Sequence, residues 1–498
     1  MSKSIAKSAV WVTISEIFFN LSGFIIHSAL GRFLGPTDYG RYGLIITLTT
    51  TVIILIGNGI PTAMAKYISE YFETDAKMVL AIKKQAVLTQ ALLVGAITAI
   101  FYFSIPLISN ALGDPTLIPL FRISTLIIPA FAMASFYFSY YTGLHKFNLQ
   151  ATLKSVRSVF RVLFVVGLAF IFNAKGLGVE GSIVGYILAP LSVFMLALSI
   201  DKFKITPELR ARVALQPKEY APVFAWKKLM NYAWQIIIFF LAYELLISID
   251  LYMVKGILLD DKLTGIYNAA LTVGRIPYYI FYAMTVFLLP MISKSTSENN
   301  HQKTNEILSQ SLRLMLILLV PMIILMSAFA KPILLDFYGK NYVDAAQAMA
   351  ILEYGVGFLT IFYVLSFAMN GAGKTKTSML IATFGVIMNT VLNYFFIKQY
   401  GIIGSAIATS ITSFVIMLMI LYYLHKYFTV LIPVQRLLKI IFAGTVLFFT
   451  TKLFSQGPIE FIFWSILLFT FYLLILFGLK EITKVDLVIF KKLILRKK

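Results

Sequence analysis

Apolar residues run through the chain in long blocks that short polar segments separate. An α-helix needs about 20 apolar residues to cross the hydrocarbon core of a bilayer. A window of that length predicts about fourteen membrane-spanning helices along the chain. They lie at residues 9–31, 42–64, 86–108, 117–139, 156–173, 181–200, 231–254, 268–291, 312–334, 346–369, 378–397, 402–424, 437–454 and 459–479.

The composition agrees with a chain that has lipid as its solvent. Hydrophobic residues make up 59% of the 498 positions and charged residues only 13%, too few to cover the surface of a soluble protein. We therefore predict an all-α membrane protein. The chain has no cysteine, which excludes disulfides and thiolate metal sites, and its four histidines are too far apart in sequence to suggest a metal site.

The net charge of +21 is explained by topology. With the N-terminus in the cytoplasm, 32 of the 43 lysine and arginine residues fall in inner segments and their margins. These include Lys154, Arg157 and Arg161 after the fourth span. This bias predicts a multi-pass protein of the cytoplasmic membrane with both termini in the cytoplasm, and it makes nucleic-acid binding an unnecessary explanation of the charge.

The chain repeats itself after about 225 residues. Residues 40–42 (Gly-Arg-Tyr) correspond to 265–267 (Gly-Ile-Tyr), and two further loop motifs match at offsets of 228 and 223 residues. An even number of spans in each copy predicts two parallel six-helix repeats. The predicted parts are a first bundle at 1–200, a basic cytoplasmic linker at 201–230, a second bundle at 231–425, and two extra helices with a basic tail at 426–498. The linker is predicted either to lie on the inner leaflet as an amphipathic segment or to be solvated.

Ionisable residues inside the spans are candidates for function, because a charge in the bilayer is costly. Four acids stand out: Glu16, Glu244, Asp250 and Glu353. In the eighth span, Arg275, Tyr278, Tyr279 and Tyr282 have the spacing of one helical stripe, which suits a phosphate and a sugar ring. The alternatives are packing between helices, for which Asn389 and Asn393 are typical, and an interfacial aromatic belt.

No pair of carboxylates, Ser/His/Asp set or nucleotide-binding fold stands out in the sequence, so we expect neither an enzyme nor direct use of ATP.

Four segments of the sequence carry a family resemblance. They are residues 30–42 after the first span, 57–68 at the end of the second, 249–270 across the seventh and eighth, and 338–342 after the ninth. They resemble the polysaccharide transporter branch, the O-antigen-type oligosaccharide flippases, of the multidrug/oligosaccharidyl-lipid/polysaccharide flippase superfamily. The resemblance implies a V-shaped MATE-like fold around a central cavity, alternating access, and outward movement of a lipid-linked saccharide.

Together these patterns predict a flippase for a polyprenyl-(pyro)phosphate-linked oligosaccharide. Its cavity is expected to carry Arg32, Asn58, Lys255, Arg275, Tyr278 and Tyr282. Glu16, Glu244, Asp250 and Glu353 are the candidates for coupling to protons or sodium, with no other cofactor. We expect a monomer whose partners are the lipid-linked substrate, membrane lipids and a glycan polymerase or glycosyltransferases.

Two other functions remain open at this point. A multidrug and toxin extrusion antiporter would need an acidic, apolar cavity for organic cations, and the basic residues weigh against it. A membrane-embedded glycosyltransferase or polymerase would need a cluster of acids or a large loop outside the membrane, and the sequence has neither.

Overall fold

A computed structural model describes residues 3–57, 59–216, 222–298, 300–428, 433–454, 457 and 459–482. Within these ranges the chain is helical nearly throughout and contains no β-strand. By its internal contacts the chain divides into two compact units, Met1–Asn268 and Ala269–Lys498. This division follows contacts, whereas the predicted bundles at 1–200 and 231–425 follow sequence similarity, so the boundaries of the repeat stay a prediction.

The first unit runs from α1 into α10, and the second from α10 to the last described helix. The helices of the first unit are α1 (Lys3–Gly57), α2 (Ile60–Tyr71), α3 (Ala76–Ala111), η1 (Pro115–Leu117), α4 (Ile118–Ser124), α5 (Ile127–Gly143), α6 (Phe147–Asn173), α7 (Gly178–Ile200), η2 (Asp201–Ile205), α8 (Thr206–Ala214), α9 (Trp226–Leu258) and the start of α10 (Asp261–Gly274). The second unit continues with α11 (Ile276–Ser297), α12 (His301–Ala328), α13 (Ala330–Tyr338), η3 (Lys340–Ala345), α14 (Ala346–Gly371), α15 (Thr375–Phe428), α16 (Val434–Thr451) and α17 (Glu460–Gly478).

Ten helical segments of the described chain are long and apolar enough to cross a membrane. Thr375–Phe428 contains the two predicted spans at 378–397 and 402–424, and Phe18–Tyr71 contains the span at 42–64 and the greater part of the span at 9–31. The predicted spans at 231–254 and 268–291 are not among the ten and coincide with α9 and with α10 plus α11. The prediction of an all-α membrane protein is confirmed.

Two of the predicted breaks between spans are each reduced to one non-helical glycine, at which two helices meet in a kink. α1 bends at Gly35, whose φ of 75° is unstrained only for glycine, and Pro36 starts the second arm. α15 bends in the same way at Gly401, with φ of 56°. The segment between residues 31 and 42, predicted as a loop, is therefore helical on both sides of one glycine.

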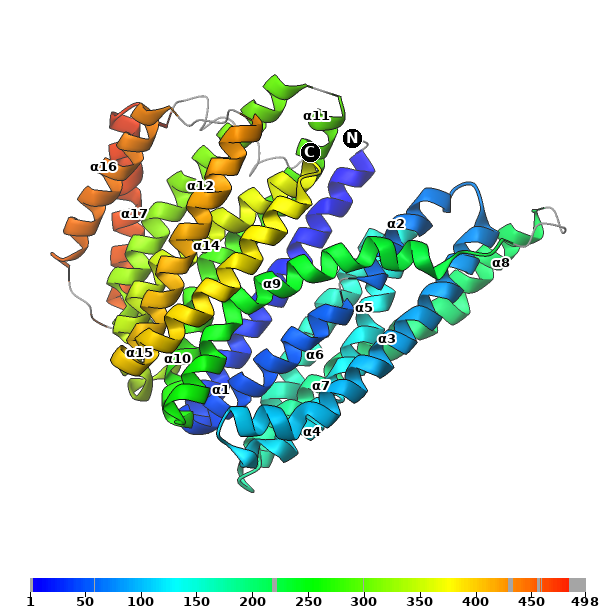
Figure 1. The fold of residues 1–498 in the computed structure, drawn as a ribbon, viewed down its shortest axis with the longest axis horizontal. Helices are drawn as coiled ribbons and strands as arrows, with labels where there is room; N and C mark the ends of the chain where they lie inside the picture. The colour runs from blue at the N-terminus through cyan, green and yellow to red at the C-terminus, as the bar shows by residue number, and fades with distance from the viewer. Residues whose placement is uncertain are drawn as a thin grey trace. The chain divides into compact units, whose positions relative to one another are not determined.

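The first unit is a helical bundle in which α1 contacts most of the other helices. α1 packs along α6, α6 packs along α7, and α5 contacts both α2 and α7 (Figure 1). Tyr137, Tyr140 and Tyr141 of α5 are buried around one ion pair, in which Lys83 Nζ lies 2.5 Å from Asp201 Oδ2. The ion pair fastens α3 to the end of α7.

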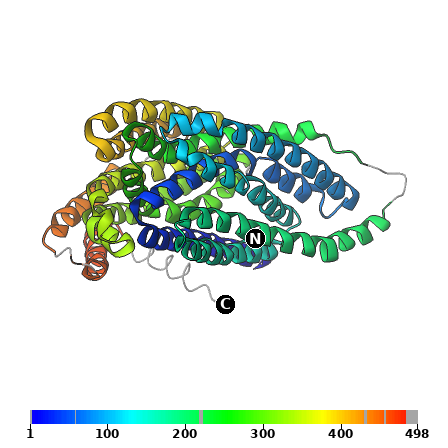
Figure 2. The same cartoon turned by 90° about the horizontal axis from the view of Figure 1, so that it is seen from below.

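The start of the predicted linker is helical. α7 continues through the π-helical turn η2 into α8, so that the three form one extended rod (Figure 2). The Arg212 guanidinium of α8 donates a 2.5 Å hydrogen bond to the carbonyl of Phe72 after α2. Residues 217–221 of this segment lie outside the described residues.

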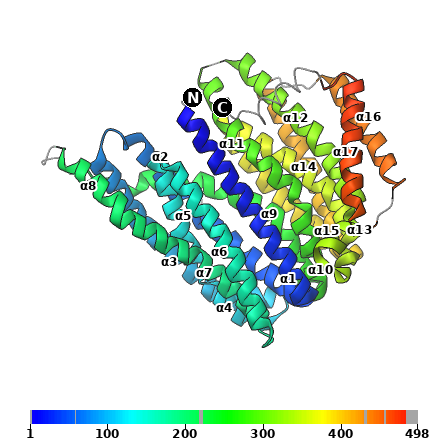
Figure 3. The ribbon, with the colours of Figure 1, turned by 180° about the vertical axis from the view of Figure 1, so that it is seen from behind.

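In the second unit, α14 packs against α11, α12 and α15. The two helices beyond the predicted repeat, α16 and α17, lie side by side, and α16 also contacts α12 (Figure 3). Arg313 of α12 pairs with Glu481, where its Nε lies 2.8 Å from Oε1. Because both side chains are largely buried, this ion pair fixes the chain after α17 to α12.

Equivalent glycines of the repeated motif touch each other inside the first unit. A Cβ atom on Gly40 of α1 would overlap the carbonyl oxygen of Asp261, and one on Gly265 of α10 would overlap that of Pro36. The main chains of α1 and α10 approach so closely that neither position has room for a side chain. The two copies of the motif thus meet, which explains the glycine in each.

We predict that Gly265→Ala destabilises the protein by about 2 kcal/mol, because the new methyl group overlaps rigid main chain rather than a flexible side chain. Thermal unfolding of the purified protein in detergent measures the change. Gly95→Ala on α3 is the matched control, because a Cβ there has no atom within 4 Å and alanine favours a helix. Equal unfolding temperatures for the two variants would contradict the close approach.

Candidate functional site

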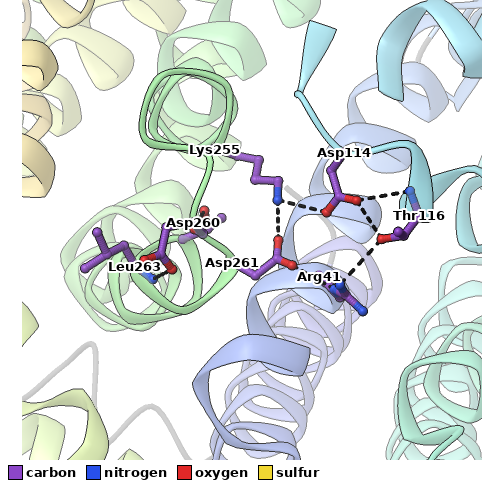
Figure 4. A network of polar contacts seen from close by, with 8 residues as sticks. Arg41, Asp114, Thr116, Lys255, Asp260, Asp261 and Leu263 are labelled. Carbon is purple, nitrogen blue, oxygen red and sulfur yellow. Dashed lines mark hydrogen bonds and ion pairs between the residues drawn. The ribbon is translucent and has the colours of Figure 1, made fainter. Parts of the chain in front are cut away.

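Lys255, near the end of α9, is the centre of a polar network at one end of the first unit. Its side chain is 3% exposed. Nζ donates to Asp114 Oδ2 at 2.9 Å and to Asp261 Oδ1 at 2.5 Å (Figure 4). Arg41 Nε donates to Asp261 Oδ2 at 2.8 Å, and a second guanidinium nitrogen reaches Thr116 Oγ1 at 3.4 Å. The network therefore joins α1, α9, α10 and the segment between α3 and η1.

Local structure brings the two aspartates to Lys255. α9 ends at Leu258, and the next residue, Leu259, has a left-handed φ of 55°. The side chain of Asp260 then accepts the amide of Leu263 at 2.9 Å, which caps the start of α10. This short turn sets Asp261 beside Lys255, six residues earlier. Asp114 is held in the same way, because it accepts the amide of Thr116 at 3.0 Å and its hydroxyl at 2.6 Å.

The network is balanced in charge, with two cations and two carboxylates. Asp114 lies in the connection between two membrane-spanning segments. Burial raises the pKa of its carboxyl, but the hydrogen bonds from Thr116 and Lys255 and the charge of Lys255 outweigh burial and hold the pKa below its usual value. Asp114 is therefore ionised at neutral pH and serves as a counter-ion of Lys255.

Three of the four predicted coupling acids have partners. Glu16 of α1 forms an ion pair with Lys154 of α6. Glu244 accepts a hydrogen bond from Ser248 at 3.0 Å, as their spacing on one helical face predicts. Asp250 is fully buried and accepts the hydroxyl of Tyr267 at 3.0 Å.

Glu353 of α14 is the exception among the predicted acids. It is 0% exposed, and neither carboxylate oxygen has a hydrogen-bond partner among the described residues. Gly274 faces it, since a Cβ there would lie 3.5 Å from Glu353 Oε1. A carboxyl group in these surroundings is stable only when it is neutral or holds a cation.

The residues predicted to line a cavity are placed as follows. Arg32 is exposed on α1, and Arg275 is half-buried at the break between α10 and α11, which Pro277 accounts for. The ring of Tyr278 lies 5.3 Å from that of Tyr279 and 5.0 Å from that of Tyr363 on α14. Asn58 and the side chain of Tyr282 lie outside the described residues.

Three basic residues that the sequence places at the cytoplasmic margin of a span carry buried charges in the structure. Lys154, Arg157 and Arg161 count in the sequence among the basic residues of an inner margin, but the structure encloses them in the first unit. Their spacing places all three on one face of a helix, and this is the feature of the sequence that could have indicated a buried cluster. The described residues contain no group of three His, Cys, Asp or Glu side chains suited to a metal ion.

Comparison with known proteins agrees with this architecture. An uncharacterised membrane protein of Methanocaldococcus jannaschii is 23% identical over 82% of this chain and 95% of its own. A probable low-salt glycan biosynthesis flippase of Haloferax volcanii is 22% identical over 43% of this chain and 47% of its own. Among solved structures, the lipid II flippase MurJ in an inward closed conformation matches 96% of this chain and all of its own, with a TM-score of 0.75 and 20% identity.

Two family models match the sequence. The model described as MatE matches residues 236–395. The model described as polysaccharide biosynthesis protein matches residues 5–296, more than half of the chain. The MurJ likeness shows a MATE-like membrane fold, and the chain belongs to the polysaccharide biosynthesis protein family of multi-pass membrane transporters.

Proposed function

We propose that this protein is a flippase that moves a polyprenyl-(pyro)phosphate-linked oligosaccharide from the inner to the outer leaflet of the cytoplasmic membrane. The observation that carries the proposal is the family match over residues 5–296, together with a fold like that of a lipid II flippase along nearly the whole chain. The structure supports an anionic substrate, because the first unit encloses more cationic than anionic side chains around α6.

The MatE match over residues 236–395 favours a second candidate, the extrusion of organic cations. Such a cargo needs carboxylates that are free to bind it. In the first unit, however, Glu16, Asp114 and Asp261 each pair with a lysine or arginine. The pairing of these three carboxylates favours the lipid-linked anion, and Glu353 of α14, within the matched range, is a carboxylate with no hydrogen-bond partner among the described residues that would remain for a cation.

Reconstitution in proteoliposomes tests this choice. A fluorescent polyprenyl-pyrophosphate oligosaccharide on one leaflet should reach the other only in vesicles that contain the protein, as a membrane-impermeant quencher reports. An organic cation of similar fluorescence should not move. Movement of the cation without movement of the lipid-linked saccharide would contradict the flippase proposal and would support the extrusion of organic cations.

We assign the Lys255 network to the outer side of the membrane. With the N-terminus in the cytoplasm, the segments that carry Arg41, Asp114 and Lys255 all fall at outer connections. Alternating access requires one side to be closed while the other is open, and an ion-pair network that forms and breaks is suited to this task. The network holds the kinked part of α1, the end of α9 and the start of α10 together, and in this proposal it releases them when the substrate leaves.

We predict that Lys255→Met destabilises the closed state by about 3 kcal/mol, because two carboxylates lose their shared cation. Export should fall at matched protein level. Adding Asp114→Asn should recover most of the stability, since the remaining pair of Arg41 and Asp261 is again balanced. Thermal unfolding and the quencher assay measure both effects.

Lys262→Gln is the matched control for this prediction, because Lys262 is exposed beside the network and makes no contact with it. A double variant that is less stable than Lys255→Met alone would show that charge balance does not hold the network together.

We further propose that Glu353 couples transport to protons or sodium. Glu353→Gln keeps the size of the side chain but fixes it in a neutral form. Export by this variant should no longer respond to an imposed proton or sodium gradient, while Glu460→Gln at the exposed start of α17 should respond as the unchanged protein does. Proteoliposomes with each gradient in turn distinguish the two ions. A full response by Glu353→Gln would remove Glu353 from coupling.

Other parts of the proposal rest on the sequence. Both termini are placed in the cytoplasm by the distribution of basic residues. The protein is proposed to act as a monomer whose partners are a glycan polymerase or glycosyltransferases.

A further inference from the structure

Three cations occupy one face of α6 inside the first unit. Lys154, Arg157 and Arg161 are three and four residues apart, so their side chains project in the same direction. Arg157 is 5% exposed and Arg161 is 7% exposed, while the side chain of Lys154 is 15% exposed. The face lies against α1 and α5 rather than against solvent.

The partners of the three cations leave positive charge unbalanced. Lys154 has Glu16 as its ion-pair partner. Arg161 donates to the carbonyl of Phe19 at 2.8 Å and to Ser22 Oγ at 2.6 Å, both neutral acceptors. The cluster therefore has three positive charges and one carboxylate in ion-pair contact among the described residues.

Arg157 is the least satisfied member of the cluster. Its guanidinium lies 5.0 Å from the ring centre of Phe19, 4.8 Å from that of Phe131 and 4.9 Å from that of Phe138. Its Nε has no hydrogen-bond partner among the described residues, and the same is true of Arg161 Nε. Aromatic faces attract a cation but cannot accept the in-plane hydrogen bonds of a guanidinium.

Such an arrangement has the properties of an anion site. Buried guanidinium groups with unused donors favour a ligand with several charged oxygens, and the planar fork of arginine fits phosphate. The aromatic rings hold Arg157 in position and exclude water, which strengthens its attraction for an anion. Glu16 is close enough to compete with that anion for Lys154.

We propose that Lys154, Arg157 and Arg161 form a buried oxyanion site within the first unit that takes a phosphate group. Two sources have this chemistry, the phosphate linkage of a lipid-carried saccharide and the headgroup of a membrane phospholipid. The positive-inside pattern places this part of α6 near the inner leaflet, where both are present. The choice of a polyprenyl carrier rests on the proposed function, whereas the oxyanion site does not.

Binding to the purified full-length protein in detergent tests the site without relying on transport. The probes are a polyprenyl monophosphate, the uncharged polyprenol of the same length, and phosphatidylglycerol, each titrated and followed by native mass spectrometry. The polyprenyl monophosphate should bind at least about tenfold more tightly than the polyprenol, because charge-assisted hydrogen bonds are lost with the phosphate. Phosphatidylglycerol binding as tightly as the polyprenyl monophosphate would identify the source as a membrane lipid and would still support the site.

Variants separate an anion site from a structural role. Arg157→Gln should weaken binding of the polyprenyl monophosphate about tenfold or more, and Arg157→Lys should weaken it less, because the charge remains without the planar fork. Arg122→Gln is the matched control, since Arg122 is an exposed arginine of α4 in the same unit that also lies over a ring, Tyr102, at 5.9 Å. It should bind as the unchanged protein does.

Glu16→Gln gives an effect of opposite sign. Removing the carboxylate frees Lys154 and raises the unbalanced charge, so the polyprenyl monophosphate should bind more tightly. A purely structural cluster would be destabilised by the same change and would gain no affinity. Equal binding of phosphate and alcohol, or unchanged binding in Arg157→Gln, overturns the proposal. A protein that binds phosphate but moves no saccharide would retain the site and refute the proposed function.

Discussion

Burying an ionised side chain is the constraint on which the rest of this structure depends. A charge taken out of water is stable only when an opposite charge or several hydrogen-bond donors or acceptors replace the lost solvent. Lys255 meets this condition with two aspartates, and Arg313 meets it with Glu481. At both points the ion pairs fasten segments of the chain that are far apart in sequence.

The backbone makes the most elaborate of these contacts possible. The bend at Gly35 and the close approach of Gly40 to Gly265 bring α1 against the start of α10. Arg41 follows Gly40 directly, so the same approach that excludes a side chain at Gly40 presents the next residue to Asp261. The glycines of the repeated Gly-x-Tyr motif therefore allow the close packing that positions the charged network. The middle residue is Arg41 in the first copy, where it binds Asp261, and Ile266 in the second.

The sequence predicts the membrane-spanning helices well, but it predicts poorly which charged residues form ion pairs across the fold. The length of apolar segments determines where helices can cross a bilayer, so the membrane fold and most spans follow from sequence alone. The connection predicted between residues 31 and 42 is longer than the observed one, because the two helices meet at a single non-helical residue, Gly35. The sequence predicts Lys255 as a cation of the substrate cavity, whereas the structure pairs it with Asp114, 141 residues earlier, and with Asp261, because no local pattern encodes the contact with Asp114. Arg157 and Arg161 were assigned to topology, since a basic residue near a span end has the same sequence signature whether it faces lipid headgroups or the interior of a bundle.

Charge balance separates the buried groups into two kinds with different consequences for a transporter. The Lys255 network is neutral as a whole, so it is complete without a ligand, and opening it in the proposed transport cycle would require energy from elsewhere. The α6 cluster and Glu353 are incomplete among the described residues, one with excess positive charge and the other with an uncompensated carboxyl. An incomplete group changes its stability when an anion, proton or sodium ion arrives, whereas a complete one does not. In the proposed transport cycle, binding at the incomplete groups supplies the energy that the neutral network requires to open, provided that the anion or the ion binds the open state more tightly than the closed one.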